Sequence, residues 1–398
     1  MRDRESRGRR TPGHQAPPAG RALPARLAIA AGVMVGAARC GGAAGGLPAD
    51  LQHLVDSAAA ASPTPGIMLR VESPKLALDW SGAAGRLDRA AEAPLPADAA
   101  VRIASNTKTF VAAATLRLVE QGRVALDTSI RRYLSDESLA ALGRGGYDSD
   151  RITVRHLLNH TSGIFDYAMS PQFGTAVFSA PDHRWTRPEQ LAFAVDSGQK
   201  VGEPGERYHY SDTGYILLGE LIERATGRSM AQAVRELLDY QRLGLRHTYF
   251  ESLEPEPEGM PVRAHQYQGD VDATGFDPSL DLYGGGGLVS TLGDLTRFYR
   301  ALLTGGVFER SETLSEMLLI TPQSEADRPG GYGMGIGRSD IAGTTCWGHS
   351  GYWGTTARYC PDLDLAIAAS VNMAGDTTGT LQRVGTAAIE YVAARSKR

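Results

Sequence analysis

Short stretches rich in aliphatic residues lie near both ends of the chain and are typical of strands. Near the start, the aliphatic stretches 66–71 and 75–80 are separated by Glu-Ser-Pro and predict a hairpin. Near the end, four short apolar stretches with short spacings predict an antiparallel meander. They are residues 332–337, 344–348, 355–360 and 365–371. Helices are expected outside these strands, over 48–60 and 381–394.

The middle of the chain instead follows a helical period, with apolar residues recurring every three or four positions. Residues 170–190 are the exception and are expected to be irregular. Thr291 and Asp294 predict a capping box for a helix over 292–303. A helix is expected to follow Ser105 and to run to Gln121. Further helices are expected over 154–160, 214–226 and 230–239.

These elements predict an α+β fold, in which an antiparallel sheet of N- and C-terminal strands is flanked by helices and carries an inserted, mainly helical lobe. The sheet lobe would comprise 47–122 and 284–398, and the helical lobe 123–283. A cleft between two such lobes is a common place for a binding site.

Composition narrows the classes of protein further. The chain has 398 residues, of which 42% are hydrophobic, and it is long enough to bury a large core. Its net charge of −4 implies no basic face, so nucleic acid is not an expected partner. Three cysteines are too few for a disulfide scaffold and lack zinc-site spacing. A monomer is expected.

Residues 1–46 differ from the rest of the chain. The first 26 residues hold seven arginines and two acidic residues, and an uncharged apolar run follows over 27–38. Such a basic region followed by a short apolar run is typical of an export signal, and the run is too short for a stable membrane span. We therefore expect an exported protein, extracellular or in the cell envelope. Cys40 suggests a lipid anchor, although Arg39 does not suit that cleavage site. The alternative is a disordered leader.

The first candidate for chemistry is Ser105-x-x-Lys108, at the head of a long apolar helix pattern. Residues three apart share a helix face, so the Lys108 amine can reach the Ser105 hydroxyl. A helix start also supplies unpaired N–H groups and partial positive charge, which favour a nucleophilic serine. Taken alone, however, a serine before a helix is usually an N-cap and a lysine there is usually a solvated surface charge.

Two further motifs follow in order. Tyr210, in Tyr210-Ser-Asp212, is either a core aromatic or a proton carrier whose pKa nearby lysine charge lowers. His349-Ser350-Gly351 ends a predicted strand, where Gly351 would allow a substrate to approach closely.

His156 and His160 have a spacing that suits a metal, but no third ligand is evident. A structural role at a helix end is therefore the expected one, and no metal is predicted.

With these three motifs in fixed order, the chain resembles the serine β-lactamase and penicillin-binding protein family, in its class C and D-alanyl-D-alanine carboxypeptidase branch. The likeness spans residues 47–395. It includes the segments Arg102–Ser105, 156–163, 215–219 and 286–291.

The resemblance implies a role for each motif residue and needs no cofactor. Ser105 would form an acyl-enzyme, Lys108 would hold or move its proton, and Tyr210 would act as general base and then protonate the leaving group. His349, with Ser350 and Gly351, would bind substrate or polarise Tyr210. The N–H groups of Ser105 and Tyr352 would form the oxyanion hole.

Asp212 departs from the family pattern, which usually has asparagine there. An ionised aspartate only accepts hydrogen bonds, so it cannot donate to a substrate carbonyl as an amide does. Asp212 would instead hold Lys108 in a salt bridge or lie in solvent. The departure puts β-lactam handling in doubt and leaves room for a different leaving group.

Cys346 and Cys360 lie symmetrically about residue 353, the middle of a predicted hairpin. Opposite positions on paired strands bring Cβ atoms close to disulfide range, so we expect a disulfide in an exported protein. The alternative is a pair of buried free thiols.

Three functions remain open from the sequence. The first is a D-alanyl-D-alanine carboxypeptidase or related D-peptidase. The second is an esterase or class C-like β-lactamase, and the third is a penicillin-binding module that acylates without turnover. A small peptide, an ester or a β-lactam is the expected partner, because acyl transfer uses the same groups for each.

Overall fold

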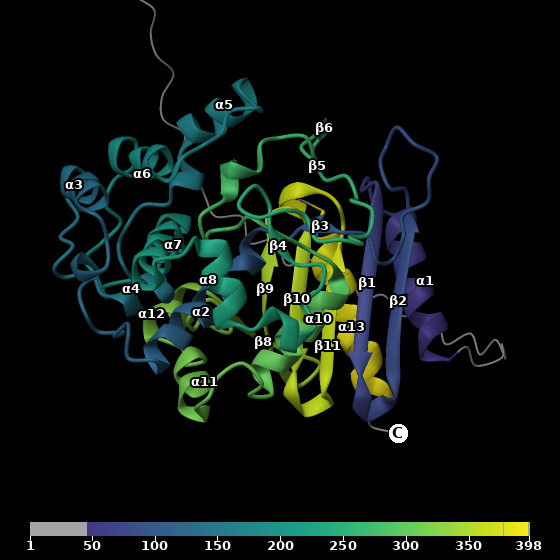
Figure 1. The fold of residues 1–398 in the computed structure, drawn as a ribbon. Coiled ribbons are helices and arrows are strands. Elements are labelled where there is room, and N and C mark those ends of the chain that lie inside the picture. The colour runs from purple at the N-terminus through teal and green to yellow at the C-terminus, as the bar shows by residue number, and fades with distance from the viewer. Residues whose placement is uncertain (1–45, 377, 397–398) are drawn as a thin grey trace, which may run out of the picture. The chain divides into compact units, whose positions relative to one another are not determined.

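The structure is a computed structural model that describes residues 46–376 and 378–396 (Figure 1). The expected export signal, its apolar run and Cys40 therefore lie outside the described residues. No helix in the described part of the chain is both long and apolar enough to cross a bilayer.

Strands from the two ends of the chain form one antiparallel sheet, as the aliphatic stretches near both ends predict. Its order is β2-β1-β11-β10-β9-β8, so the N-terminal hairpin pairs with the last strand. Met68 of β1, for example, lies opposite Ser370 of β11. The α+β fold class is confirmed. The six strands are β1 (Gly66–Ser73), β2 (Leu78–Gly85), β8 (Gly337–Ile341), β9 (Thr344–Gly351), β10 (Thr355–Cys360) and β11 (Leu365–Ser370).

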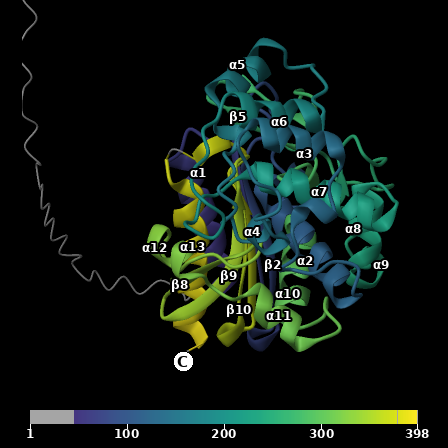
Figure 2. The ribbon, with the colours of Figure 1, turned by 90° about the vertical axis from the view of Figure 1, so that its left-hand side faces the viewer.

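Alternation along the central strands decides what covers each face of the sheet. On one face, Leu69 and Ile367 pack with helices α1 (Leu47–Ala60) and α13 (Thr380–Ser396). On the other face, Ala366 and Ala368 belong to the larger core. Figure 2 shows α13 and α10 on opposite sides of the sheet. Small residues on this second face let α10 (Leu292–Leu303) lie close to β11.

The larger core also contains the buried face of α2, and the remaining helices are arranged around it. They are α2 (Thr107–Glu120), α3 (Asp136–Arg144), α4 (Val154–Leu158), α5 (Pro171–Ser179), α6 (Arg187–Asp196), α7 (Asp212–Thr226), α8 (Met230–Leu237), α9 (Tyr240–Leu243), α11 (Ser311–Met317) and α12 (Pro322–Asp327). The division into a sheet lobe and a helical lobe at residues 122 and 284 stays a prediction.

Residues 170–190 are not irregular, so that expectation is wrong. Ser170 caps α5 by accepting a hydrogen bond from the Phe173 N–H, and Thr186 forms a reciprocal capping box with Glu189 at the start of α6. A proline in the first turn of each helix fits these caps.

Three other boundaries also differ from expectation. The strand expected at 332–337 is instead a turn, in which Tyr332 bridges to Gly337, and β8 begins at Gly337. The second hairpin strand begins at Leu78, after a short helical turn. The expected reciprocal box at Thr291 is half formed. Thr291 accepts from the Asp294 N–H, while the Asp294 carboxylate accepts from the His247 N–H.

Two small sheets complete the fold. One has the order β3-β7-β4, from β3 (Val101–Arg102), β7 (Leu288–Ser290) and β4 (Tyr249–Phe250). The other pairs β5 (Tyr267–Gln268) with β6 (Val271–Asp272). Because β3 leads directly into residues 104–106, pairing with β7 fixes the approach to α2.

Candidate active site

Ser105 lies in a tight turn between β3 and α2. Ala104, just before it, has a left-handed backbone with φ of 44°, which is a strained conformation for a residue with a Cβ. One turn later, Lys108 is fully buried on the same side of the helix. Its Nζ lies 2.9 Å from Ser105 Oγ. The expected serine–lysine contact is therefore present in the structure.

Lys108 has two further partners besides Ser105. Its Nζ donates to the Gly285 carbonyl at 2.6 Å and lies 2.5 Å from Asp212 Oδ1. Two hydrogen bonds and one ion pair therefore surround the Lys108 ammonium group. Asp212 stands at the first position of α7, where helix N–H groups favour a carboxylate. Of the two alternatives for Asp212, a salt bridge to Lys108 or a position in solvent, the structure has the salt bridge.

Tyr210 comes from the segment just before α7 and lies against both groups. It lines the same pocket as Ser105, and Lys108 Nζ is 4.9 Å from its ring centroid. Burial, and then the charge of Asp212, raise the pKa of Tyr210 well above its usual value. A lowered pKa, which one of the two alternatives for Tyr210 invoked, stays a prediction for other states of the site. Tyr210 is a protonated phenol here and can donate.

The end of β9 reaches the Ser105 turn, and a glycine makes that approach possible. A Cβ on Gly351 would lie 2.1 Å from the Ile103 carbonyl oxygen, so only glycine fits. Tyr352 and Trp353, which follow, line the same pocket as Ser105. The oxyanion role of the Ser105 and Tyr352 N–H groups stays a prediction.

His349 and Ser350 are not part of the pocket lining. His349 is buried, and its Nε2 is 2.9 Å from the Tyr332 hydroxyl while its Nδ1 is 2.7 Å from the Ser350 carbonyl. Burial and the charge of Lys108 lower the pKa of His349 to about 3. It is therefore neutral and engaged by Tyr332, with its ring centroid 6.1 Å from that of Tyr210. The Ser350 hydroxyl bonds to Thr356.

A pocket of about 410 Å³ opens beside Ser105. One part of its wall is apolar and comes mostly from α5 and the segment before β7. These residues are Tyr167, Met169, Phe173, Val177, Phe178, Phe276, Leu280 and Trp353. The sequence analysis did not predict this wall, because it expected the region of α5 to be irregular.

The other part of the wall carries three carboxyl groups, of which only Asp212 was expected. Burial and the charge of Asp212 raise the pKa of Asp166, and they raise the pKa of Asp281 to about 7. Oδ1 of Asp281 is buried with no hydrogen-bond partner among the described residues. Neither position stands in a motif, so no sequence signal pointed to these two residues. The pocket thus combines an apolar wall with an acidic one.

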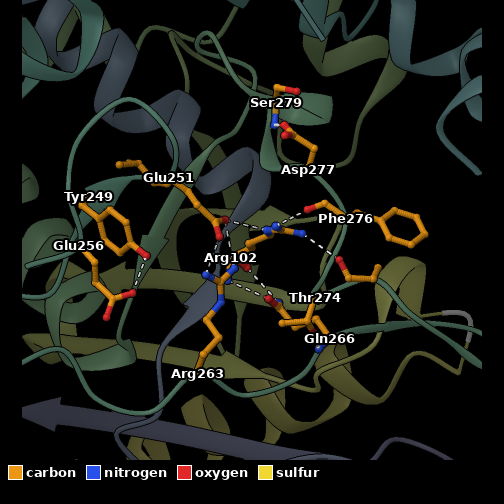
Figure 3. Close-up of polar contacts among 12 residues, drawn as sticks. Arg102, Tyr249, Glu251, Glu256, Arg263, Gln266, Thr274, Phe276, Asp277 and Ser279 are labelled. Atoms are coloured by element: carbon orange, nitrogen blue, oxygen red, sulfur yellow. Dashed lines mark hydrogen bonds and ion pairs between the residues drawn. The ribbon is translucent and has the colours of Figure 1, made fainter. Parts of the chain in front are cut away.

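A buried guanidinium anchors the pocket wall to β3 (Figure 3). Arg102 pairs with Glu251 at 2.8 Å and donates to the carbonyls of Ala273 and Phe276 at 2.9 and 2.7 Å. Gln266 donates to the carbonyls of Arg102 and Trp353. The wall that includes Phe276 is therefore fixed relative to the strand that presents Ser105.

The two histidines with metal-like spacing lie in different environments. His156 Nδ1 accepts from the Thr153 N–H and caps α4, whereas His160 lies against Tyr210. Within residues 46–376 and 378–396, no cluster of three or more His, Cys, Asp or Glu side chains could hold a metal ion.

Cys346 and Cys360 face each other across β9 and β10. Their Cα atoms are 4.1 Å apart and their sulfurs are within bonding distance.

This fold, with a serine and a lysine one turn apart at the start of a buried helix, defines a class of serine hydrolases that includes penicillin-binding proteins. Residues 51–388 match the family described as Beta-lactamase, and the chain belongs to that family.

Solved structures with this fold include two amide hydrolases. A D-stereospecific amidohydrolase from Streptomyces sp. is 29% identical with a TM-score of 0.71, and the match covers 84% of this chain and 97% of that one. A D-amino acid amidase from Ochrobactrum anthropi SV3, complexed with D-phenylalanine, is 27% identical with a TM-score of 0.75. That match covers 88% of this chain and 99% of the amidase.

The curated relatives match over shorter regions. Esterase EstB of Burkholderia gladioli is 36% identical over 188 residues, which is 46% of this chain and 47% of the esterase. Penicillin-binding protein 4* of Bacillus subtilis is 27% identical over 274 residues, which is 65% of this chain and 57% of that protein. The matches thus span about half of the length of these relatives.

Proposed function

We propose that the chain is a serine hydrolase that cleaves an amide bond of a D-amino-acid substrate through an acyl-enzyme on Ser105. The observation that carries this proposal is the hydrogen bond between Lys108 and Ser105, with Tyr210 lining the same pocket and lying close to Lys108. D-alanyl-D-alanine carboxypeptidases and related D-peptidases fall within this class, and so do amidases that act on D-amino-acid amides.

The proton positions suggest the order of steps. Asp212 takes a proton from Lys108, and the resulting amine accepts the Ser105 proton as Oγ attacks the carbonyl carbon. N–H groups of Ser105 and Tyr352 stabilise the oxyanion; loss of one such donor costs about 100- to 1000-fold in rate. The carbon–nitrogen bond then breaks, and Tyr210 donates its proton to the leaving nitrogen.

Deacylation restores the starting groups. The Tyr210 phenolate accepts a proton from the attacking water, and Lys108 returns a proton to Ser105 Oγ as the ester bond breaks. Asp212 then gives its proton back to Lys108. Aspartate at position 212 therefore has a use that asparagine would not have, because only a carboxylate can take the lysine proton.

The two-sided pocket supports a substrate with a free amine and an apolar side chain. An ammonium group beside Asp166 and Asp281 would give the buried Asp281 Oδ1 the donor that it lacks. An aromatic or aliphatic side chain would then lie against Phe173 and Phe276. The similarity to the D-stereospecific amidohydrolase and the D-amino acid amidase points to the same substrate class.

A substrate panel tests this proposal. Purified protein would be assayed with D-phenylalanine amide, its L enantiomer, a D-Ala-D-Ala peptide, nitrophenyl butyrate and a chromogenic cephalosporin. We expect the D-amide to be hydrolysed fastest, Ser105→Ala to abolish turnover, and the exposed-serine control Ser57→Ala to behave as wild type. Full activity in Ser105→Ala would refute the mechanism, and a preference for the L-amide would refute the substrate class.

An esterase is the second candidate, favoured by the 36% identity to Esterase EstB over 188 residues. Because the ester leaving group needs no strong acid, an esterase would tolerate Tyr210→Phe far better than an amidase would. Butyrate hydrolysis that exceeds amide hydrolysis and survives Tyr210→Phe would favour the esterase.

We also propose that the protein is exported and acts as a monomer, with a disulfide between Cys346 and Cys360. The basic and apolar composition of residues 1–46 supports export. The facing cysteines support the disulfide, since such bonds persist in oxidising compartments. A lipid anchor at Cys40 stays a second possibility for the same leader.

A further inference from the structure

One buried histidine underlies Tyr210. His160 is 1% exposed, and its ring lies 4.3 Å from the Tyr210 ring, centroid to centroid, at a tilt of 34°. It follows the end of α4 and is not part of the pocket lining. It therefore has no direct path to a substrate, but it makes broad contact with the phenol that the proposed reaction uses.

The same residue holds the backbone on both sides of Tyr210. The His209 N–H donates to the His160 carbonyl at 2.8 Å, and the Ser211 N–H donates to His160 Nδ1 at 3.1 Å. A single residue thus contacts the peptide before Tyr210, the ring itself and the peptide after it. Few rotations of the Tyr210 side chain are compatible with all three contacts.

An unusual backbone conformation makes this arrangement possible. His160 has φ of 60°, in the left-handed region that histidine and asparagine enter more readily than most residues. The turn directs both its carbonyl and its ring toward residues 209–211. The strain is of the kind that persists where surrounding contacts fix a functional segment.

The protonation of the ring follows from its contacts. Because Nδ1 accepts from a backbone N–H, the ring is neutral and carries its proton on Nε2. Nε2 is buried without a hydrogen-bond partner among the described residues. The rings of Tyr208, Tyr215 and Tyr332 surround it, with centroids at 5.9, 5.1 and 5.0 Å.

We propose that His160 is a positioning residue for Tyr210, which holds the phenol in a fixed orientation in the pocket that it shares with Ser105. This inference rests on the proposed function, because it assigns a role only if Tyr210 transfers a proton. Misplacing a catalytic group by about 1 Å costs about 100-fold in rate. A loosened Tyr210 should therefore lower kcat and leave substrate binding nearly unchanged.

His156 provides a matched control. It is four residues away and also accepts a backbone hydrogen bond through Nδ1, but it caps α4 and does not touch Tyr210. Substituting it with alanine should lower stability through loss of a cap and leave kcat unchanged.

A double-mutant cycle tests the proposal. We expect His160→Phe, which keeps a ring but loses the acceptor, to lower kcat on the best substrate by about 10- to 100-fold with KM changed less than about twofold. His160→Asn, which keeps an acceptor and tolerates the left-handed backbone, should recover most of that loss. In a Tyr210→Phe background, His160→Phe should cause no further loss.

The outcomes separate the two proposals. Equal losses from His160→Phe with and without Tyr210 would overturn the positioning role, as would wild-type kcat in a folded His160→Phe. If Ser105→Ala or Tyr210→Phe kept full activity, the proposed function itself would fail. Melting temperatures of all variants show whether each is folded, and His160→Asn keeps the test decisive if His160→Phe does not fold.

Discussion

Lys108, a single buried side chain, determines the charge of the pocket. It contacts Ser105, Asp212 and Gly285. One neighbouring carboxylate is enough to neutralise it, yet Asp166 and Asp281 also line the pocket. The pocket has more carboxyl groups than cations to pair with them, so Asp166 and Asp281 are held partly as neutral acids.

The free energy of unfolding should therefore depend on pH through Asp281. Its pKa is raised to about 7 by burial and by Asp212, whereas an unfolded aspartate titrates near 3.8. A group with a raised pKa stabilises the fold fully below its unfolded pKa, and that stability is lost as pH rises through the folded pKa. Between pH 4 and 7 the loss should reach up to about 4 kcal/mol.

Urea unfolding from pH 4.5 to 8.5 would measure this effect, with Asp281→Asn as the comparison. The pKa values of His349 and His160 are lowered, so these histidines destabilise the fold as pH falls, which opposes the effect of Asp281. Both histidines are present in both proteins, so the difference between the two curves isolates Asp281. We expect the advantage of the wild type to shrink steadily with rising pH. Parallel curves would show that Asp281 is not protonated in the fold.

At the scale of elements, the end of β9 and the start of α2 must meet within a few ångströms. Gly351 and the Ile103 carbonyl are in van der Waals contact, and Asn106 donates to both Ile103 and Thr355. These contacts tie the end of β9 and the start of β10 to the turn that presents Ser105. Any group inserted between them must separate the two expected oxyanion donors.

Gly351→Ala should therefore reduce kcat sharply while most of the fold survives. An added Cβ would lie 2.1 Å from the Ile103 oxygen, so β9 has to move away from the Ser105 turn. We expect a loss of at least about 100-fold, comparable to removal of one oxyanion donor. Gly143→Ala, at an exposed position of α3 with no atom within 4 Å of the new Cβ, should have no effect. Equal activity of both variants would disprove the close-approach argument.

Periodicity predicted those elements whose apolar faces are regular. The strands containing Leu69 and Ile367 are short, nearly continuous apolar stretches and α10 repeats with a helical period, so they lie nearly where the sequence predicts them. The stretch 332–337 reads as a strand by its aliphatic residues, but Gly335 takes a positive φ of 73° and turns the chain back. Helix α5 escaped recognition because its start depends on the Ser170 cap.

Ser105, Lys108, Tyr210 and Asp212 were found from the sequence because each stands in a short motif, and the structure brings these four together. Asp166 and Asp281 were not found, because they come from segments more than a hundred residues apart and have no motif. Only the folded chain brings them to one wall. The role of His349 was expected from its motif, but burial engages its ring with Tyr332 instead.

At the scale of the whole molecule, the two cores lie on opposite faces of one sheet and serve different ends. The face toward α2 and α10 supports the pocket, whereas the face toward α1 and α13 carries Cys346 and Cys360 within its core. A disulfide there would lie in a different core from the one that supports the Ser105 pocket. It would stabilise the sheet without altering the chemistry.

If the protein is exported, the form recovered from the culture medium or cell envelope should contain the Cys346–Cys360 bond. An unreduced mass spectrum should then be lighter by two hydrogen atoms than the reduced one. Closing a loop with a sequence separation of 14 stabilises a fold by about 3 kcal/mol, so reduction should lower the free energy of unfolding by about that amount. A Cys346→Ser/Cys360→Ser double variant should be insensitive to reductant. Free thiols in the exported form would contradict the prediction.

The pairing of β1 with β11 has a consequence for synthesis. Met68 finds its partner Ser370 only after about 300 further residues have been synthesised, and contacts so distant in sequence form slowly. In the described sheet, β9, which approaches Ser105, is joined to β1 through β10 and β11. A chain that ends before β11 therefore lacks the framework that aligns the nucleophile, and reactivity should arise as a single event after β11 has been synthesised.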